Sequence, residues 1–266
     1  MTVRSLLAIA VGISAAGAAL ASDYIIVQST TSTANSGLYE EILPQFRAQS
    51  GTEVRVVAVG TGQALKNAAN CDGDVLLVHA RAAEQEFVTS GFGTARFDVM
   101  YNDFVLVGPS GDPAGVAQTQ SAADALDRIA ERQAVFVSRG DDSGTHKAET
   151  GLWRTAPDAQ SSRWYRELGA GMGATLNAAV AMGAYTLTDR ATWLSFGNRG
   201  AHQVLLEGDP ALFNQYGVIA VSPEHCPRVK ADAAQGFVDW LIGPDGQSAI
   251  AAFQINGTQL FVPNAK

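Results

Sequence analysis

The sequence predicts an α/β fold built on a wound, mostly parallel sheet, and three observations support this. Apolar and β-branched runs at 24–27, 53–59 and 74–79 are typical of short buried strands. The segment 37–49 carries apolar residues at helical spacing, and a further helix is expected to begin at 60–66. Strands that alternate with helices form parallel sheets, which bind ligands beyond the carboxyl ends of their strands.

A long apolar strand at 100–107 leads into a turn-rich segment at 108–115, which we interpret as the first crossing between two lobes. A strand at 215–221 is suited to the return crossing. The other expected elements are helices at 121–131, 145–154, 164–168, 175–182, 234–241 and 244–253, a strand at 134–137, and a strand with a turn at 183–190.

The composition is that of an ordinary soluble protein, with 47% hydrophobic and 17% charged residues among 266. The formal net charge of -8 argues against a nucleic-acid or anionic-membrane partner. A small anion is compatible with this charge, because local donors and dipoles decide such a site.

The N-terminus has the features of a signal peptide, predicted to comprise residues 1–21. Arg4 supplies a positive charge, an apolar stretch follows at 6–20, and Ala19-Leu20-Ala21 has the form of a cleavage site. The stretch is short and rich in small residues for a membrane anchor. We therefore expect a periplasmic or otherwise secreted protein.

Cys71 and Cys226 are the two cysteines of the chain. In an oxidising compartment we expect one disulfide if the fold brings them together. The alternative is a metal site that includes His225, although two thiols without recognisable ligand spacing make a poor zinc site.

The segment 138–149 is the main candidate for a functional site. It places Arg139, Ser143 and Thr145 in a polar loop between a predicted strand and a predicted helix. Free backbone N–H groups at a helix start, hydroxyls and a guanidinium all suit an oxyanion. We therefore predict an oxyanion cradle.

Two other interpretations of this segment stay open. Ser143 or Asp142 could serve only as a helix cap while Arg139 pairs with Asp141 or Asp142. Nucleophilic catalysis by Ser143 with His146 is disfavoured, because the nucleophile elbow needs glycine where Asp141 stands.

Further donors follow other predicted strands. Ser29-Thr30-Thr31-Ser32-Thr33 is a run of five hydroxyl residues, predicted to form a loop between the strand at 24–27 and the helix at 37–49, and it has more hydroxyls than helix capping requires. The loop at 60–63 combines two glycines with Thr61. The segment 183–190 is another candidate, although Asp189 could simply pair with Arg190. His79 ends a strand, where a histidine is more often packed and hydrogen-bonded than a ligand.

Taken together, these motifs resemble those of the tungstate-binding receptors of ABC-type importers, a family of periplasmic oxyanion-binding proteins. The resemblance spans nearly the whole mature chain. Its motifs are Ser29-Thr30-Thr31-Ser32-Thr33, Ala58-Val59-Gly60-Thr61-Gly62-Gln63-Ala64-Leu65, Val78-His79-Ala80, Met100-Tyr101-Asn102-Asp103-Phe104-Val105, Ser138-Arg139-Gly140-Asp141-Asp142-Ser143-Gly144-Thr145-His146, Gly171-Met172-Gly173-Ala174-Thr175-Leu176 and Ala184-Tyr185-Thr186-Leu187-Thr188-Asp189-Arg190. Ser29 stands where the family usually has threonine, a change that keeps the hydroxyl.

The resemblance implies a type II periplasmic-binding-protein fold, with two lobes that are each a mostly parallel sheet flanked by helices. Two crossing strands serve as the hinge. Lobe 1 would comprise 22–107 and 218–266, lobe 2 would comprise 108–217, and both cysteines would fall in lobe 1. The implied oxyanion ligands are Ser29, Thr30, Thr31, Ser32, Thr61, Arg139, Ser143, Gly144, Thr145 and Thr188.

The implied function is capture of tungstate, or of molybdate, and its delivery to a membrane permease by a monomer without cofactor or catalytic activity. A phosphate or sulfate receptor is the alternative, because Asp141 or Asp142 could accept a hydrogen bond from a protonated phosphate. A secreted serine hydrolase is a more distant one.

Overall fold

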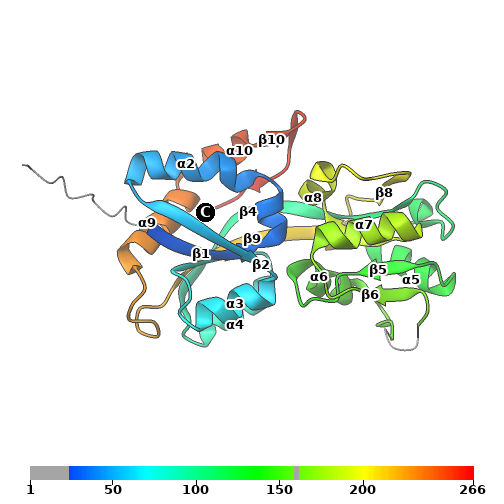
Figure 1. The fold of residues 1–266 in the computed structure, drawn as a ribbon, viewed down its shortest axis with the longest axis horizontal. Helices are drawn as coiled ribbons and strands as arrows, with labels where there is room; N and C mark the ends of the chain where they lie inside the picture. The colour runs from blue at the N-terminus through cyan, green and yellow to red at the C-terminus, as the bar shows by residue number, and fades with distance from the viewer. Residues whose placement is uncertain (1–23, 159–161) are drawn as a thin grey trace, which may run out of the picture.

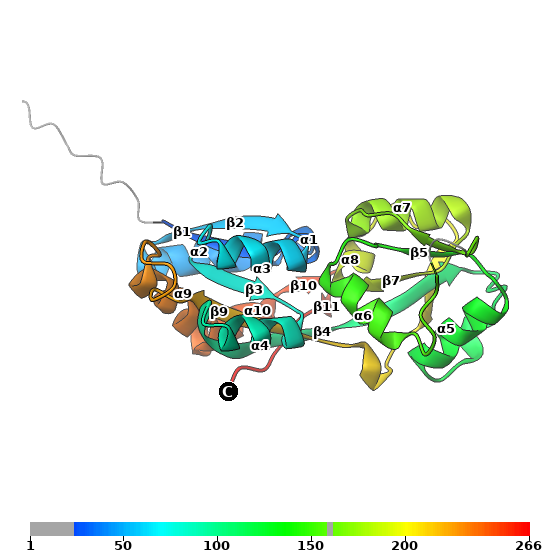
Figure 2. The same cartoon turned by 90° about the horizontal axis from the view of Figure 1, so that it is seen from below.

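The computed structural model describes residues 24–158 and 162–266, so the predicted signal peptide lies outside the described residues. Two lobes lie end to end, and two long strands, β4 and β9, pass between them (Figures 1 and 2). Within the described residues, every helix is too short or too polar to cross a membrane.

The sheet of lobe 1 has the strand order β12-β4-β9-β3-β1-β2. The expected parallel arrangement holds among β1, β2 and β3, whereas β9 runs antiparallel to β3 and to β4. The sheet is therefore mixed, because one crossing strand leaves the lobe and the other returns. The strands are β1 (Tyr24–Thr30), β2 (Glu53–Val59), β3 (Val75–Val78), β4 (Gly93–Pro109), β9 (Phe213–Val221) and β12 (Val262–Pro263).

Helices cover both faces of this sheet (Figure 1). On β3 the side chains alternate: Val75 and Leu77 belong to the core beneath α2 and α9, whereas Leu76 and Val78 belong to the core beneath α3 and α4. A strand buried on both faces explains the continuous apolar run in the sequence. The helices are α1 (Thr31–Asn35), α2 (Leu38–Ser50), α3 (Thr61–Ala69), α4 (Arg81–Thr89), α9 (Ala231–Ile242) and α10 (Pro244–Ala252), and a small hairpin of β10 (Gln254–Ile255) and β11 (Thr258–Gln259) follows.

Lobe 2 is built on the second half of β4, which pairs antiparallel with β7 and β8. Strand β5 pairs parallel with β6 and forms a bridge to Tyr185, just before β7. The elements are β5 (Phe136–Ser138), β6 (Tyr165–Glu167), β7 (Thr186–Asp189), β8 (His202–Leu206), α5 (Ala122–Glu131), α6 (Gly144–Leu152), α7 (Met172–Met182), α8 (Arg190–Ser195) and two 3-10 turns, η1 (Val116–Gln118) and η2 (Pro210–Leu212). The predicted division of the chain at 107/108 and 217/218 stays a prediction.

Three local predictions are wrong. The segment 164–168 is not a helix, because Tyr165 stacks on Phe136 and β6 pairs with β5. The hydroxyl run is not a loop, because β1 extends to Thr30 and α1 begins at Thr31. The turn predicted at the end of 183–190 is the start of α8, which Asp189 caps.

The predicted disulfide between Cys71 and Cys226 is confirmed, with a Cα–Cα distance of 5.4 Å. It joins the end of α3 to the segment after β9, two parts of lobe 1 that are 155 residues apart in sequence. Both thiols are used in this bond, and His225 Nε2 donates to the carbonyl of Ala69. The alternative Cys–His metal site is therefore not formed by this cluster.

Replacing both cysteines, Cys71→Ser with Cys226→Ser, is expected to lower the free energy of unfolding by about 2–4 kcal/mol, because the bond closes a long loop. Urea unfolding of the oxidised protein and of the double variant measures this difference. Two reactive thiols in the denatured, unreduced protein would contradict the bridge.

Candidate anion-binding site between the lobes

Three helices begin directly after strands or short loops at the side where the lobes meet. Thr30 caps α1, Gly60 caps α3 and Ser143 caps α6. The first N–H groups of a helix lack partners within the helix and carry partial positive charge. Their common position therefore favours an anion.

The lobes touch where α3 and α6 begin. The backbone N–H of Gly144, in lobe 2, donates to the hydroxyl of Thr61, in lobe 1, at 3.0 Å. A Cβ on Gly144 would lie 2.6 Å from the ring of His79, and a Cβ on Gly62 would lie 2.1 Å from the carboxylate of Asp142. Glycine at these two positions allows the lobes to approach closely.

The hydroxyl residues of α1 form a buried cluster on the lobe 1 side. Thr30 Oγ1 accepts from the backbone N–H of Thr33 and lies 2.7 Å from the Thr33 hydroxyl and 3.1 Å from that of Ser32. Ser32 Oγ in turn lies 3.3 Å from His79 Nε2. Thr31 is the first residue of α1 and is half-buried. The structure therefore brings together two of the predicted ligands of this run, Thr30 and Ser32, and places Thr31 between them in sequence.

Arg139 and Ser143 already have partners within lobe 2. The Nε and Nη2 atoms of Arg139, which is only 4% exposed, donate to Asp141 at 3.2 and 2.6 Å. Asp141 also accepts from the backbone N–H of Ser143, and Ser143 Oγ accepts from that of His146. Burial raises the pKa of Asp141, but hydrogen bonds from Arg139 and Ser143 outweigh it and hold the pKa below its usual value. The pairing and capping alternatives are thus both present.

A buried carboxylate fixes this loop to α6. Glu149 accepts from the hydroxyl of Ser138 at 2.5 Å, from the Trp153 ring N–H at 3.0 Å and from the Tyr165 hydroxyl at 2.7 Å. Burial raises the pKa of Glu149 despite these hydrogen bonds. Because Ser138 precedes Arg139, the network holds the backbone from which the guanidinium extends.

Thr145 differs from its neighbours, because its buried hydroxyl has no hydrogen-bond partner among the described residues. Buried polar side-chain atoms in folded proteins almost always have a partner. An unused hydroxyl beside the Thr61–Gly144 contact is therefore a candidate ligand donor.

Two predicted ligands are not joined to this cluster. Ser29 Oγ donates to the carbonyl of Leu77 and accepts from the hydroxyl of Tyr39, both within lobe 1. Thr188 Oγ1 donates to the carbonyl of Asp189 at 3.2 Å. Within the described residues, neither hydroxyl contacts another predicted ligand.

Sequence reasoning missed a polar chain behind the cluster. His79 Nδ1 lies 3.0 Å from Asn214 Oδ1, and Asn214 Nδ2 donates to Asn102 Oδ1 at 2.6 Å. The signal for His79 was its place at the end of β3, at the same sheet edge as the other donors. Asn214, which is 135 residues away from it in sequence, gave no comparable signal.

The alternative pairing of Asp189 with Arg190 is not what the structure shows. Both oxygens of Asp189 accept from Thr192, from its N–H and from its hydroxyl. Burial raises the pKa of Asp189, whereas Thr192 and Arg139 lower it, and the net shift is upward. Arg190 instead pairs with Asp103 and Glu207.

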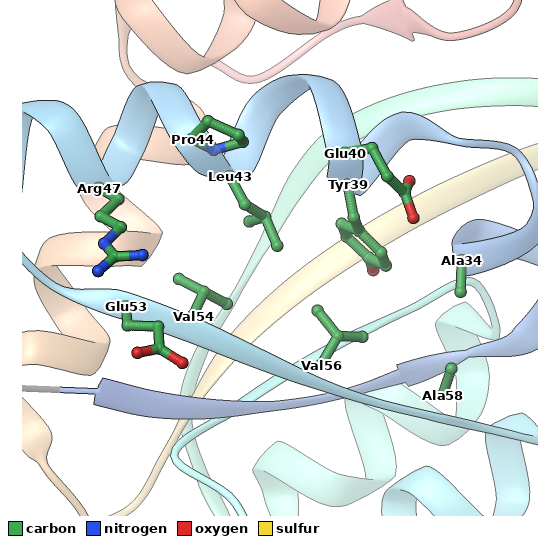
Figure 3. A pocket seen from close by; sticks show the side chains of 10 residues that line it. All are labelled: Ala34, Tyr39, Glu40, Leu43, Pro44, Arg47, Glu53, Val54, Val56 and Ala58. Atoms are coloured by element: carbon green, nitrogen blue, oxygen red, sulfur yellow. The ribbon is translucent and has the colours of Figure 1, made fainter.

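Two hollows differ in their relation to this cluster. One of about 510 Å³ lies between α2 and β2, its lining does not include Thr61 or Gly144, and Figure 3 shows Leu43, Val54 and Val56 on its walls. The other, of about 580 Å³, is lined by His79 and Gly144 together with Asn214 and therefore borders the contact between the lobes.

The chain is similar to known proteins over most of its length. Residues 14–245 match the model of a family described as the PBP superfamily domain. The tungstate-binding protein TupA of Peptoclostridium acidaminophilum is 46% identical over 245 residues, which are 91% of this chain and 86% of that protein. The tungstate-binding protein TupA of Campylobacter jejuni is 38% identical over 242 residues, 88% of this chain and 89% of that protein.

Solved structures agree with these relatives. The tungstate-binding protein TupA from Desulfovibrio alaskensis G20 is 50% identical, with a TM-score of 0.78 over 92% of this chain and 100% of that chain. A structure described as the tungstate ABC transporter from Geobacter sulfurreducens is 46% identical, with a TM-score of 0.79 over 86% of this chain and 98% of that chain.

The fold and the site define a two-lobed periplasmic binding protein of the PBP superfamily. Within that superfamily, the chain belongs to the family of the tungstate-binding proteins TupA. The resemblance seen in the sequence and the predicted two-lobed fold are thereby confirmed.

Gly144→Ala is expected to hold the lobes apart, because the added methyl group would overlap the His79 ring. Small-angle X-ray scattering should give a larger radius of gyration for this variant than for the wild type. Gly151→Ala is the matched control, since it lies in the same helix with nothing within 4 Å of its Cβ. Equal radii for all three proteins would show that Gly144 does not control the approach of the lobes.

Proposed function

We propose that this protein captures tungstate between its two lobes and delivers it to the membrane permease of an ABC importer, with molybdate as a second candidate ligand. The proposed site comprises donors from both lobes at the start of α1, α3 and α6. The observation that carries the proposal is the buried Thr145 hydroxyl, which has no partner among the described residues and adjoins the Thr61–Gly144 contact between the lobes.

The chemistry of the ligand explains the choice of side chains. A tetrahedral dianion such as tungstate offers only acceptors, so its site should present donors. Thr61 Oγ1 accepts from a backbone N–H, which leaves its hydroxyl hydrogen free to donate. Ser143 Oγ also accepts from a backbone N–H, but its side chain interacts with Asp141 as well, so its hydroxyl would have to turn from Asp141 to the anion. Arg139 adds a charge-assisted donor, although Asp141 offsets part of its charge. The proposed ligands are Thr30, Thr31, Ser32, Thr61, Arg139, Ser143, Gly144 and Thr145, while Ser29 and Thr188 remain weaker candidates.

The relatives support the ligand and the partner. Proteins that are 46–50% identical over most of this chain are described as tungstate-binding proteins or as part of a tungstate ABC transporter. We propose a periplasmic monomer whose lobes close on the anion, with the predicted signal peptide directing export.

A phosphate or sulfate receptor is not favoured. A protonated phosphate would need an acceptor, but Asp141 is occupied by Arg139 and Ser143, and Asp142 is exposed and pairs with Lys147. Catalysis by Ser143 has no support either. Its hydroxyl contacts the backbone N–H of His146, while His146 Nδ1 accepts from the N–H of Asp142.

Calorimetric titration of the anion-free protein with tungstate, molybdate, sulfate and phosphate tests the proposal. We expect tight one-to-one binding of tungstate, with sulfate and phosphate giving no heat of binding. Binding of phosphate without tungstate would overturn the assignment of the ligand.

Arg139→Ala should weaken tungstate binding by roughly 1.5–3 kcal/mol for each charge-assisted hydrogen bond lost. The same titration measures this loss. Arg154→Ala is the control, because this arginine of lobe 2 is exposed and pairs with Asp124 and Asp127 on the surface. Equal affinities in the two variants would remove Arg139 from the site.

A further inference from the structure

His79 occupies a central position that the proposed ligand set does not use. It is buried directly after β3, and its ring lies between Ser32 of α1 and Asn214 of the crossing strand β9. The ring packs 4.8 Å from that of Tyr216, and the backbone of Gly144 approaches its edge from lobe 2. His79 therefore contacts the hydroxyl cluster, a hinge strand and the opposite lobe.

The hydrogen bonds around His79 fix which ring nitrogen carries hydrogen. Asn214 uses its Nδ2 to donate to Asn102, so it presents the acceptor Oδ1 to His79 Nδ1. Nδ1 is then the protonated nitrogen of the neutral ring, and Nε2 carries a lone pair. The contact with Ser32 at 3.3 Å is therefore donated by the Ser32 hydroxyl.

This arrangement opposes a dianion in two ways. The hydroxyl hydrogen of Ser32 is used in the bond to His79 and is not available to the anion. The lone pair on His79 Nε2 is an acceptor in a site that should contain only donors. Protonation of Nε2 would reverse both effects, because the ring would donate to Ser32 Oγ and release the Ser32 hydrogen for the anion. It would also supply a positive charge, which matters because Arg139 is paired with Asp141.

We propose that capture of the oxyanion is accompanied by uptake of one proton from solvent, which His79 Nε2 accepts. This inference rests on the proposed function and adds His79 to the site as a positioning residue for Ser32. The anion then meets donors from Ser32 and the neighbouring hydroxyls, with the imidazolium behind them.

The surroundings of His79 are consistent with this change of charge. Burial lowers its pKa to about 4, Asn214 opposes the shift and Arg139 adds to it, so the ring is neutral in the anion-free protein. Tyr216, whose pKa burial raises well above its ordinary value, is the titratable group packed on the ring. Arg81, Glu86 and Lys147 line the adjoining hollow. Asp141 pairs with Arg139, and Asp189 interacts electrostatically with both Arg139 and Tyr216. A bound dianion would raise the pKa of His79.

Linkage sets the direction of the pH dependence. If His79 takes up a proton only in the complex, the affinity for tungstate rises as the pH falls. The rise begins at the pKa of His79 in the complex and ends at about 4, its pKa in the anion-free protein. The affinity should change by up to about tenfold per pH unit in that window. Above the pKa of the complex the affinity should be constant.

The test is calorimetric titration with tungstate at one pH in buffers that differ in ionisation enthalpy. A plot of the binding enthalpy against the ionisation enthalpy of the buffer has a slope equal to the number of protons taken up. We expect this number to approach one as the pH is lowered towards about 6. His79→Gln can still reach Ser32 and His79→Asn can still reach Asn214, but neither can take up a proton. Both variants should show no uptake, with His79→Gln binding more tightly than His79→Asn.

Two other histidines serve as controls. His202 is buried in lobe 2, where its Nε2 donates to the carbonyl of Ala184, and His146 accepts from the backbone of the loop before α6. His202→Gln and His146→Gln should both keep the proton uptake. In the wild type, NMR of isotope-labelled histidine should show His79 neutral without tungstate and doubly protonated with it, a result that does not depend on any variant.

The outcomes separate this inference from the proposed function. Tungstate binding with no proton uptake in the wild type, or uptake that survives both His79 variants or disappears with His146→Gln, would overturn the role of His79. Failure of the wild type to bind tungstate at all would instead overturn the proposed function on which the inference rests.

Discussion

Strand β4 changes its partner between Asp103 and Phe104, and the arrangement of the whole molecule depends on this change. Asp103 pairs with Phe213 on β9, whereas Phe104 pairs with Asp189 on β7. Arg190 reinforces the junction, because it donates to both oxygens of Asp103 at 2.8 and 2.6 Å. One continuous strand thus belongs to both sheets, so relative movement of the lobes has to be accommodated by a few residues at this crossing and at the return crossing that leads into β9.

The crossing brings together polar groups that would be costly to bury alone. Uncompensated burial of a hydroxyl or a charge is unfavourable, and the lobes supply internal partners for their donors, with the Thr145 hydroxyl as an exception among the described residues. Thr30 bonds to Thr33 in lobe 1, and Arg139 bonds to Asp141 in lobe 2. These contacts hold the donors in place before a ligand arrives, but the Asp141 carboxylate also reduces the charge that Arg139 can offer. The helix N-termini and His79 gain importance for that reason.

The sequence predicted well those features that depend on local patterns. The limits of β2 were correct at 53–59, and those of α2 were correct to within a residue, because alternation and helical spacing are local signals. The strand β6 was missed, because only its pairing with β5 stabilises so short a segment. For the site, the sequence indicated the donors at the strand ends. It could not choose between ligand binding and internal pairing for Arg139, and it could not show the contact of His79 with Asn214, which the fold alone creates.

The central claim is that the anion lies between the two lobes, at the start of α3 and α6. Anomalous X-ray scattering from tungsten in crystals of the tungstate complex would locate the ion directly. The account predicts a single strong peak within hydrogen-bonding distance of Arg139 and Thr145 and adjacent to Thr61. A peak in the groove between α2 and β2, or one that contacts a single lobe only, would contradict it.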